Sequence, residues 1–256
     1  MQHEDGFYFH ALPSPSGSAR ALIIILHGHG SHPDQYLKWA KKTQAENPAA
    51  DVLVVRAPVA LQASEEQKRA QRLPAVDDLY TWYNLDEKPV APDLKQPFNR
   101  AAIVSQLNRF IDAQMKKRNL QDENLAIIGF SQGALMAVDA ALHSNRSCAA
   151  VVSHSGAVMP FAQAARKPDV LMIMGDKDDL FSLPEDGSKP SASRTVEAFR
   201  KAGIKANMDH PSSVERLKKA GIAVTEKVVK NQGHRITEES WHEASAFVAK
   251  KIKLKK

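Results

Sequence analysis

A buried strand that breaks into a tight turn and restarts as a buried helix is the feature that most constrains this chain. Residues 124–135 read NLAIIGFSQGAL, and the turn is the G-F-S-Q-G of residues 129–133. A G-x-S-x-G turn between strand and helix presents its serine hydroxyl out of the sheet. The two glycines are expected where a Cβ would collide with the neighbouring strand or helix. We therefore expect Ser131 to be a nucleophile beside the amide groups of a helix N-terminus.

Strand-like and helix-like segments alternate along the chain, which indicates an α/β fold. Apolar runs predict strands at 7–12, 21–26, 51–55, 125–128, 149–153, 170–174 and 223–229. Apolar periodicity predicts helices at 99–118, at 134–142 and from about residue 237 onward. This order predicts a mostly parallel central sheet with helices on both faces, and functional loops at the carboxyl ends of its strands.

Composition is compatible with one domain that spans residues 1–256. The chain is 43% apolar and 25% charged, which are ordinary values for a globular protein. No run of 18 apolar residues occurs, and the start MQHEDGFYFH has neither the basic nor the apolar region of a signal peptide. Cys148 is the only cysteine, so an intramolecular disulfide is excluded. A cytoplasmic location is the expectation.

Two segments exceed what such a sheet needs. Residues 60–97 form a long polar insertion that we interpret as a lid or pocket wall. Its aromatic residues Trp82 and Tyr83 are expected either to bind substrate or to pack the insertion down. The second segment, an extra helix at about 190–212, belongs to a repeat in which VEAFRKAGIKA returns 18 residues later as VERLKKAGIAV. Each copy is predicted to be a helix closed by glycine.

A serine hydroxyl needs an adjacent base and a carboxylate that orients the base. His234 follows a glycine just after the last predicted strand and is the favoured base, with His154 in reserve. The three aspartates within residues 176–179 all follow one strand, and spacing alone does not separate them. Their order, serine then aspartate then histidine, is the order in which this topology delivers a catalytic triad.

The loop HGHG at residues 27–30 supplies the second half of the predicted machinery. Its glycines let the backbone turn an amide toward Ser131, so the main chains of His29 and Gln132 are the expected oxyanion donors. The alternative is a metal site built from His27, His29 and His32. The sequence lacks the helical H-E-x-x-H spacing and a nearby acidic ligand, so no metal is expected.

Positive charge gathers at the C-terminus, where five of the last seven residues are lysines (Lys250, Lys251, Lys253, Lys255, Lys256). The favoured interpretation is a helix end whose cations complement the helix dipole. The alternative is contact with anionic lipid or nucleic acid. Because no aromatic residues are interleaved with these lysines, we expect no nucleic-acid partner and at most peripheral membrane contact.

Taken together, the motifs LHGHG, GFSQGA, GDKDD, QGH and WYNL resemble the carboxylesterase/phospholipase family of α/β-hydrolases, which includes acyl-protein thioesterases. The resemblance runs from about Ala21 to the C-terminus. It implies the α/β-hydrolase fold, a Ser131–His234–Asp178 triad and oxyanion donors at His29 and Gln132. It also implies that no cofactor is needed, and that a homodimer is possible because many members of the family dimerise.

The resemblance implies a serine hydrolase that cleaves carboxylic esters through an acyl-enzyme, with short- to medium-chain acyl esters as the expected substrates. The alternative enzyme is a lysophospholipase or acyl-protein thioesterase. An alternative of another class is a non-catalytic binding protein on the same fold. Three departures from the family pattern bear on the substrate: Met174 where histidine is usual, Asp179 where proline often stands, and His29 where an apolar residue is usual.

Overall fold

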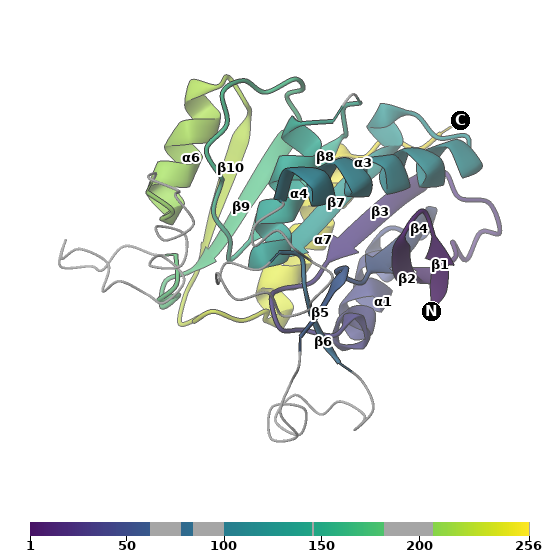
Figure 1. Ribbon diagram of the computed structural model, residues 1–256, viewed down its shortest axis with the longest axis horizontal. Helices are drawn as coiled ribbons and strands as arrows, with labels where there is room; N and C mark the ends of the chain where they lie inside the picture. Colours follow the sequence, from purple (N-terminus) through teal and green to yellow (C-terminus); the bar gives the residue numbers. More distant parts are fainter. Residues whose placement is uncertain (62–77, 84–99, 145, 182–206, 256) are drawn as a thin grey trace.

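The computed structural model describes residues 1–61, 78–83, 100–144, 146–181 and 207–255 (Figure 1). Its centre is an eight-stranded sheet of order β1-β2-β4-β3-β7-β8-β9-β10. The strands are β1 (Gln2–Glu4), β2 (Phe7–Leu12), β3 (Ala21–Leu26), β4 (Ala50–Val55), β7 (Leu125–Phe130), β8 (Ala150–His154), β9 (Asp169–Gly175) and β10 (Val224–Val229). All neighbours from β4 to β10 pair in parallel, whereas β1 and β2 form an antiparallel edge.

Helices cover both faces of the sheet, as the strand and helix alternation predicted (Figure 1). One face carries α3 (Arg100–Lys117), α4 (Gln132–Leu142) and α6 (His210–Lys219), whose apolar side chains share a core with it. The other face packs on α1 (Leu37–Glu46) and α7 (Glu238–Lys251). Every residue of β3 and the first five of β7 are buried. Coverage of both faces explains why these strands are continuous apolar runs.

Helix α1 was not predicted, because its sequence LKWAKKTQAE buries only a narrow stripe. Trp39 on this stripe packs against Trp241 of α7, with ring centroids 5.6 Å apart. The start of α7 was predicted: Thr237 caps it by accepting a hydrogen bond from the Ser240 amide. The described residues also include two short 3-10 helices, Pro33–Tyr36 and Asp122–Asn124.

The two predicted extra segments are described only in part. The structure contains a small antiparallel sheet of β5 (Val59–Leu61), where the segment 60–97 begins, and β6 (Leu79–Thr81) within it, while 62–77 and 84–97 lie outside the described residues. Most of the helix expected at 190–212 also lies outside them. The second copy of the repeat is helical as predicted: α6 is followed by Gly221 at φ 72°, a left-handed conformation that glycine adopts without strain.

None of the helices among the described residues combines the length and the apolar character that crossing a bilayer requires.

Candidate active site

Ser131 occupies a sharp turn between β7 and α4. Its backbone lies at φ 54° and ψ −120°, a sparsely populated conformation that costs about 1–3 kcal/mol for a residue with a side chain. Its amide donates to the His154 carbonyl at 2.9 Å, which ties the turn to β8. A Cβ on Gly129 would lie 2.1 Å from the Gly133 carbonyl oxygen, and one on Gly133 would lie 2.3 Å from that of Leu26. Both glycines of the motif thus stand where they were predicted to be required.

Three predicted side chains form one hydrogen-bonded chain. His234 Nε2 lies 2.9 Å from Ser131 Oγ. On the other side of the ring, His234 Nδ1 lies 3.1 and 3.0 Å from the two carboxylate oxygens of Asp178. An ionised carboxylate can only accept, so Nδ1 carries a proton, and in the neutral ring Nε2 is left to accept the serine proton. This is the arrangement that a general base and its nucleophile need.

The structure separates the three aspartates that spacing could not. Asp178 is fully buried and faces His234, whereas Asp179 is exposed and Asp176 accepts a hydrogen bond from the Gln232 amide. Burial disfavours the charged form of Asp178, but the hydrogen bonds and positive charge of His234 outweigh it and hold the pKa below its usual value. Asp178 is therefore a permanently ionised partner for the imidazole near neutral pH.

Aromatic rings hold the His234 ring in place. The Phe130 ring lies 5.1 Å from it and the Phe181 ring 5.9 Å from it, between centroids. These contacts leave the imidazole only 18% exposed at the side chain, with its two nitrogens aimed at Ser131 and Asp178.

The two residues predicted to supply oxyanion donors belong to segments that lie next to the serine. Gln132 is the first residue of α4, so its amide is one of the unpaired donors of that helix N-terminus. The loop with His29 approaches from β3, where a Cβ on Gly28 would lie 3.3 Å from the Ser131 Cβ. The His29 side chain is exposed, and its Nδ1 lies 2.8 Å from Thr81 Oγ1.

Trp82 and Tyr83, expected to bind substrate or to pack the insertion down, are only 0% and 1% exposed. Trp82 donates from its indole nitrogen to the His27 carbonyl at 2.8 Å and from its amide to Gln132 Oε1 at 2.9 Å. Such burial is what the packing alternative expects. Direct contact of either side chain with substrate stays a prediction.

His27, one member of the metal alternative, has both ring nitrogens engaged with the main chain. Nδ1 donates to the Gly28 carbonyl at 2.8 Å, and Nε2 accepts from the Ala57 amide at 3.0 Å. Burial lowers its pKa to about 4, so the ring is neutral. Within the described ranges, no group of three or more histidine, cysteine, aspartate or glutamate side chains is arranged to hold a metal. His27 is thus a structural residue of this loop.

His154, the reserve base, is fully buried and does not join the hydrogen-bonded chain. Its ring packs on Phe130, 5.3 Å between centroids, and no other described residue hydrogen-bonds either ring nitrogen. Burial lowers its pKa to about 3, with the nearby His234 acting in the same direction and Asp178 opposing. The folded protein therefore holds this histidine neutral.

Replacing His154 by leucine is expected to reduce the loss of stability, measured as the free energy of unfolding, when the pH is lowered below neutral. Below pH 6.5 the unfolded chain protonates this histidine and the folded chain does not until about pH 3, so the free energy of unfolding falls as pH falls. Between pH 7 and 5 the loss from one such group is at most about 2 kcal/mol. Denaturant titrations at both pH values should show a smaller loss in the leucine variant, and equal losses would contradict this reasoning.

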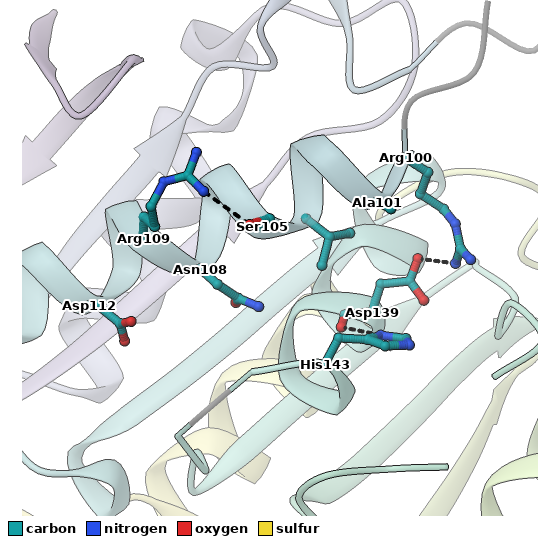
Figure 2. Close-up of a pocket in the computed structure, with 9 residues that line it drawn as sticks. Arg100, Ala101, Ser105, Asn108, Arg109, Asp112, Asp139 and His143 are labelled. Atoms are coloured by element: carbon teal, nitrogen blue, oxygen red, sulfur yellow. Dashed lines mark hydrogen bonds and ion pairs between the residues drawn. The ribbon is translucent and has the colours of Figure 1, made fainter. Parts of the chain in front are cut away.

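A separate pocket lies between α3 and α4 (Figure 2), and none of the predicted site residues lines it. Two of its lining residues, Arg100 and Asp139, form an ion pair in which the Asp139 side chain is 2% exposed. Asp139 is buried and is the one charged residue of α4. Burial raises the pKa of Asp139, and Arg100 opposes the rise. The arginine therefore stabilises the ionised form of this buried carboxylate. The pocket therefore belongs to the packing of the two helices.

Sequence reasoning missed Thr81. This buried residue of β6 contacts His29 and Gln132, which come from segments about 50 residues away on either side. It stands inside the WYNL neighbourhood with no motif of its own, so only the spatial arrangement identifies it.

The sheet order, the strand-to-helix turn and the hydrogen-bonded Ser131–His234–Asp178 chain define an α/β-hydrolase architecture. Over residues 10–179 the sequence matches the family model described as phospholipase/carboxylesterase. The match covers more than half of the chain, which therefore belongs to this family of ester-hydrolysing enzymes. His234 lies beyond the matched range, and the structure is what places it beside Ser131.

Solved structures agree on the fold. Esterase PE8 is 23% identical, with a TM-score of 0.71 over 96% of this chain and 99% of that one. A carboxylesterase from Bacillus cereus is 18% identical, with a TM-score of 0.61 over 96% and 95%. SOBER1 from Arabidopsis thaliana is also 18% identical, with a TM-score of 0.62 over 92% and 100%. At these identities the likeness extends to the fold alone.

Proposed function

We propose that this protein is a serine carboxylesterase that acts on short- to medium-chain acyl esters through an acyl-enzyme. The observation that carries the proposal is the chain of hydrogen bonds from Ser131 Oγ through His234 to Asp178. The strained conformation of Ser131 adds support, because backbone strain is retained where it presents a functional side chain.

In the first half of the reaction, Ser131 Oγ attacks the ester carbonyl carbon while its proton passes to His234 Nε2. The negative charge that develops on the carbonyl oxygen is stabilised by the main-chain amides of His29 and Gln132. Asp178 stabilises the imidazolium and keeps Nδ1 protonated. When the tetrahedral intermediate collapses, the carbon–oxygen bond to the alcohol breaks, and His234 returns its proton to the departing alkoxide.

In the second half, a water molecule replaces the alcohol. His234 Nε2 takes a proton from this water as its oxygen attacks the acyl carbon. The second tetrahedral intermediate collapses with cleavage of the bond to Ser131 Oγ, which regains its proton from His234. The products are a carboxylic acid and the free enzyme, and no cofactor takes part.

Substrate preference is tested by a panel of water-soluble esters with acyl chains of two to about sixteen carbons. A matched thioester and a lysophospholipid are added to the panel. We expect the highest kcat/KM for chains of about two to eight carbons. A maximum on the lysophospholipid or on long-chain thioesters would instead support the lysophospholipase or acyl-protein thioesterase alternative. Hydrolysis of none of these compounds would favour the non-catalytic binding protein.

The position of the basic tail argues against a membrane-held substrate. The tail is anchored at the amino ends of the strands: the Lys253 amide donates to the Glu123 carbonyl at 2.8 Å, and that of Lys255 to Arg20 at 2.9 Å. Arg20 and Glu123 precede β3 and β7, whereas Ser131 follows the other end of β7. Six strand residues separate the two edges by about 20 Å. A surface that bound the tail would therefore hold Ser131 away from it.

Neutralising the tail is expected to leave ester hydrolysis unchanged. A variant with Lys250, Lys253 and Lys255 replaced by glutamine should keep kcat/KM on a soluble ester within about two-fold of wild type. Salt screens the electrostatic effect of exposed charges beyond about 10 Å, and the tail lies further than that from Ser131. The same variant is compared with wild type for co-sedimentation with vesicles rich in phosphatidylserine. Tail-dependent binding together with faster hydrolysis of a vesicle-borne ester would contradict the soluble-substrate proposal.

A further inference from the structure

The small sheet of β5 and β6 lies against the loop that carries His29. The Gly30 amide donates to the Tyr80 carbonyl and the Tyr80 amide donates to the Ser31 carbonyl, both at 3.0 Å. These two bonds form an antiparallel bridge between the loop and β6. The bridge brings Thr81, which is fully buried, next to the His29 ring.

The hydroxyl of Thr81 contacts three polar atoms at once. Its Oγ1 lies 2.8 Å from His29 Nδ1, 2.9 Å from Gln132 Oε1 and 2.9 Å from the Tyr83 carbonyl oxygen. A hydroxyl has a single proton to donate and otherwise accepts. The identity of each neighbour as donor or acceptor therefore decides which way the proton points.

The Gln132 amide can be oriented from its other partners. The Trp82 amide is a donor only, so the Gln132 atom 2.9 Å from it is Oε1. The Tyr83 carbonyl is an acceptor only, so the atom 2.8 Å from it is Nε2. Two of the three neighbours of the Thr81 hydroxyl, Gln132 Oε1 and the Tyr83 carbonyl, are consequently acceptors.

The proton of Thr81 therefore points to one of these oxygens, and His29 Nδ1 donates to Oγ1. The opposite arrangement, with Thr81 donating to His29, would leave both oxygen–oxygen contacts of 2.9 Å without any proton between them. In its neutral form, His29 is thus the tautomer with hydrogen on Nδ1. The preference follows from three distances around one buried hydroxyl: hydrogen on Nδ1 leaves a single oxygen–oxygen contact without a proton, whereas the opposite arrangement leaves two.

We propose that Thr81 is a positioning residue that braces both sides of the oxyanion hole and fixes the tautomer of His29. This inference rests on the proposed function, in which the main-chain amides of His29 and Gln132 stabilise the oxyanion. One buried hydroxyl joins these two residues, which belong to different segments of the chain. Donors that are held in place before the reaction need no reorganisation when the charge develops.

The variant Thr81→Val removes the hydroxyl and keeps the branched shape. We expect kcat on a soluble ester to fall about tenfold, less than the 10²–10³-fold typical of deleting a donor itself, with KM changed less than about two-fold. Thr81→Ser keeps the hydroxyl and should retain kcat within about two-fold of wild type. Thr225→Val makes the same replacement on an exposed strand position of β10 and controls for the general effect of the substitution.

The tautomer gives a readout that does not depend on catalysis. Nitrogen-15 chemical shifts of the His29 ring, recorded at about pH 8.5 in a Ser131→Ala background, should show hydrogen on Nδ1. Adding Thr81→Val should change the tautomer distribution, and adding Thr81→Ser should not. A loss of kcat through general loosening of the fold would lower the melting temperature without changing the His29 tautomer in this selective way.

Two results would overturn the proposal: hydrogen on Nε2 of neutral His29 in the protein with Thr81 intact, or equal kcat for Thr81→Val, Thr81→Ser and wild type. Failure of the proposed function looks different. If wild type hydrolyses no ester, the esterase assignment falls, while the nitrogen shifts of His29 still decide whether Thr81 sets its tautomer.

Discussion

Replacing Ser131 by alanine is expected to lower kcat for ester hydrolysis by about 10⁴–10⁶-fold. The nucleophile, its base and the orienting carboxylate act as one unit, so removing the attacking oxygen removes nearly all of their effect. Residual hydrolysis would come from the oxyanion donors and from substrate binding alone. The measurement is steady-state kinetics on a short-chain ester, with active-site concentration taken from the wild-type burst.

The same substitution should leave the fold intact. Alanine keeps the Cβ that already sits in the strained turn, and Ser131 contributes one hydrogen bond to a partly exposed histidine. The free energy of unfolding is therefore expected within about 0.5 kcal/mol of wild type. Ser105→Ala, on the exposed surface of α3, is the matched serine control and should keep full activity. Wild-type rates in Ser131→Ala would show that the nucleophile lies elsewhere.

The second large effect concerns stability. Gly133→Ala is expected to lower the melting temperature by about 10 °C or more, or to prevent soluble expression, because clashes in the core cost several kcal/mol. The new Cβ would lie 2.3 Å from the Leu26 carbonyl oxygen and 2.5 Å from that of His27. Both are main-chain atoms at the end of β3, so neither can rotate away. Relief would require α4 to move off the sheet and carry Ser131 with it.

A control variant, Gly17→Ala, separates the effect of a steric clash of the new Cβ from the effect of an unfavourable backbone conformation. Gly17 lies at φ 77°, and a Cβ placed on it would meet nothing within 4 Å. Gly17→Ala therefore carries the cost of a left-handed conformation alone, about 1–2 kcal/mol. Thermal unfolding monitored by circular dichroism compares the two variants. A loss for Gly133→Ala no larger than that for Gly17→Ala would mean that the close packing of α4 on β3 is not required.

Most strands of the sheet could be predicted from the sequence. Helices cover both faces of the sheet and bury β3 and β7, so these strands are continuous apolar runs. The proximity of Ser131 and His234 could be predicted for a related reason: each follows a strand end, and parallel strand ends converge. Helix α1 was missed because its buried stripe is narrow. Trp39 of α1 packs against Trp241, which lies about 200 residues further along the chain, so no local sequence pattern reveals the contact.

The details of the site needed three dimensions. Asp176, Asp178 and Asp179 follow the same strand, and which carboxylate meets His234 depends on how the loop turns. Trp82 is likewise buried in a segment whose main-chain amide donates to the Gln132 side chain, 50 residues further along the chain. Pairings of this kind join segments with no shared periodicity, so residue spacing does not encode them.

The central claim is that Ser131 is an activated nucleophile. Its most direct test is intact mass spectrometry after incubation with a fluorophosphonate, which reacts covalently with such serines. We expect one adduct on wild type and on Ser105→Ala, and none on Ser131→Ala. No adduct on wild type, or an adduct that persists in Ser131→Ala, would contradict the claim.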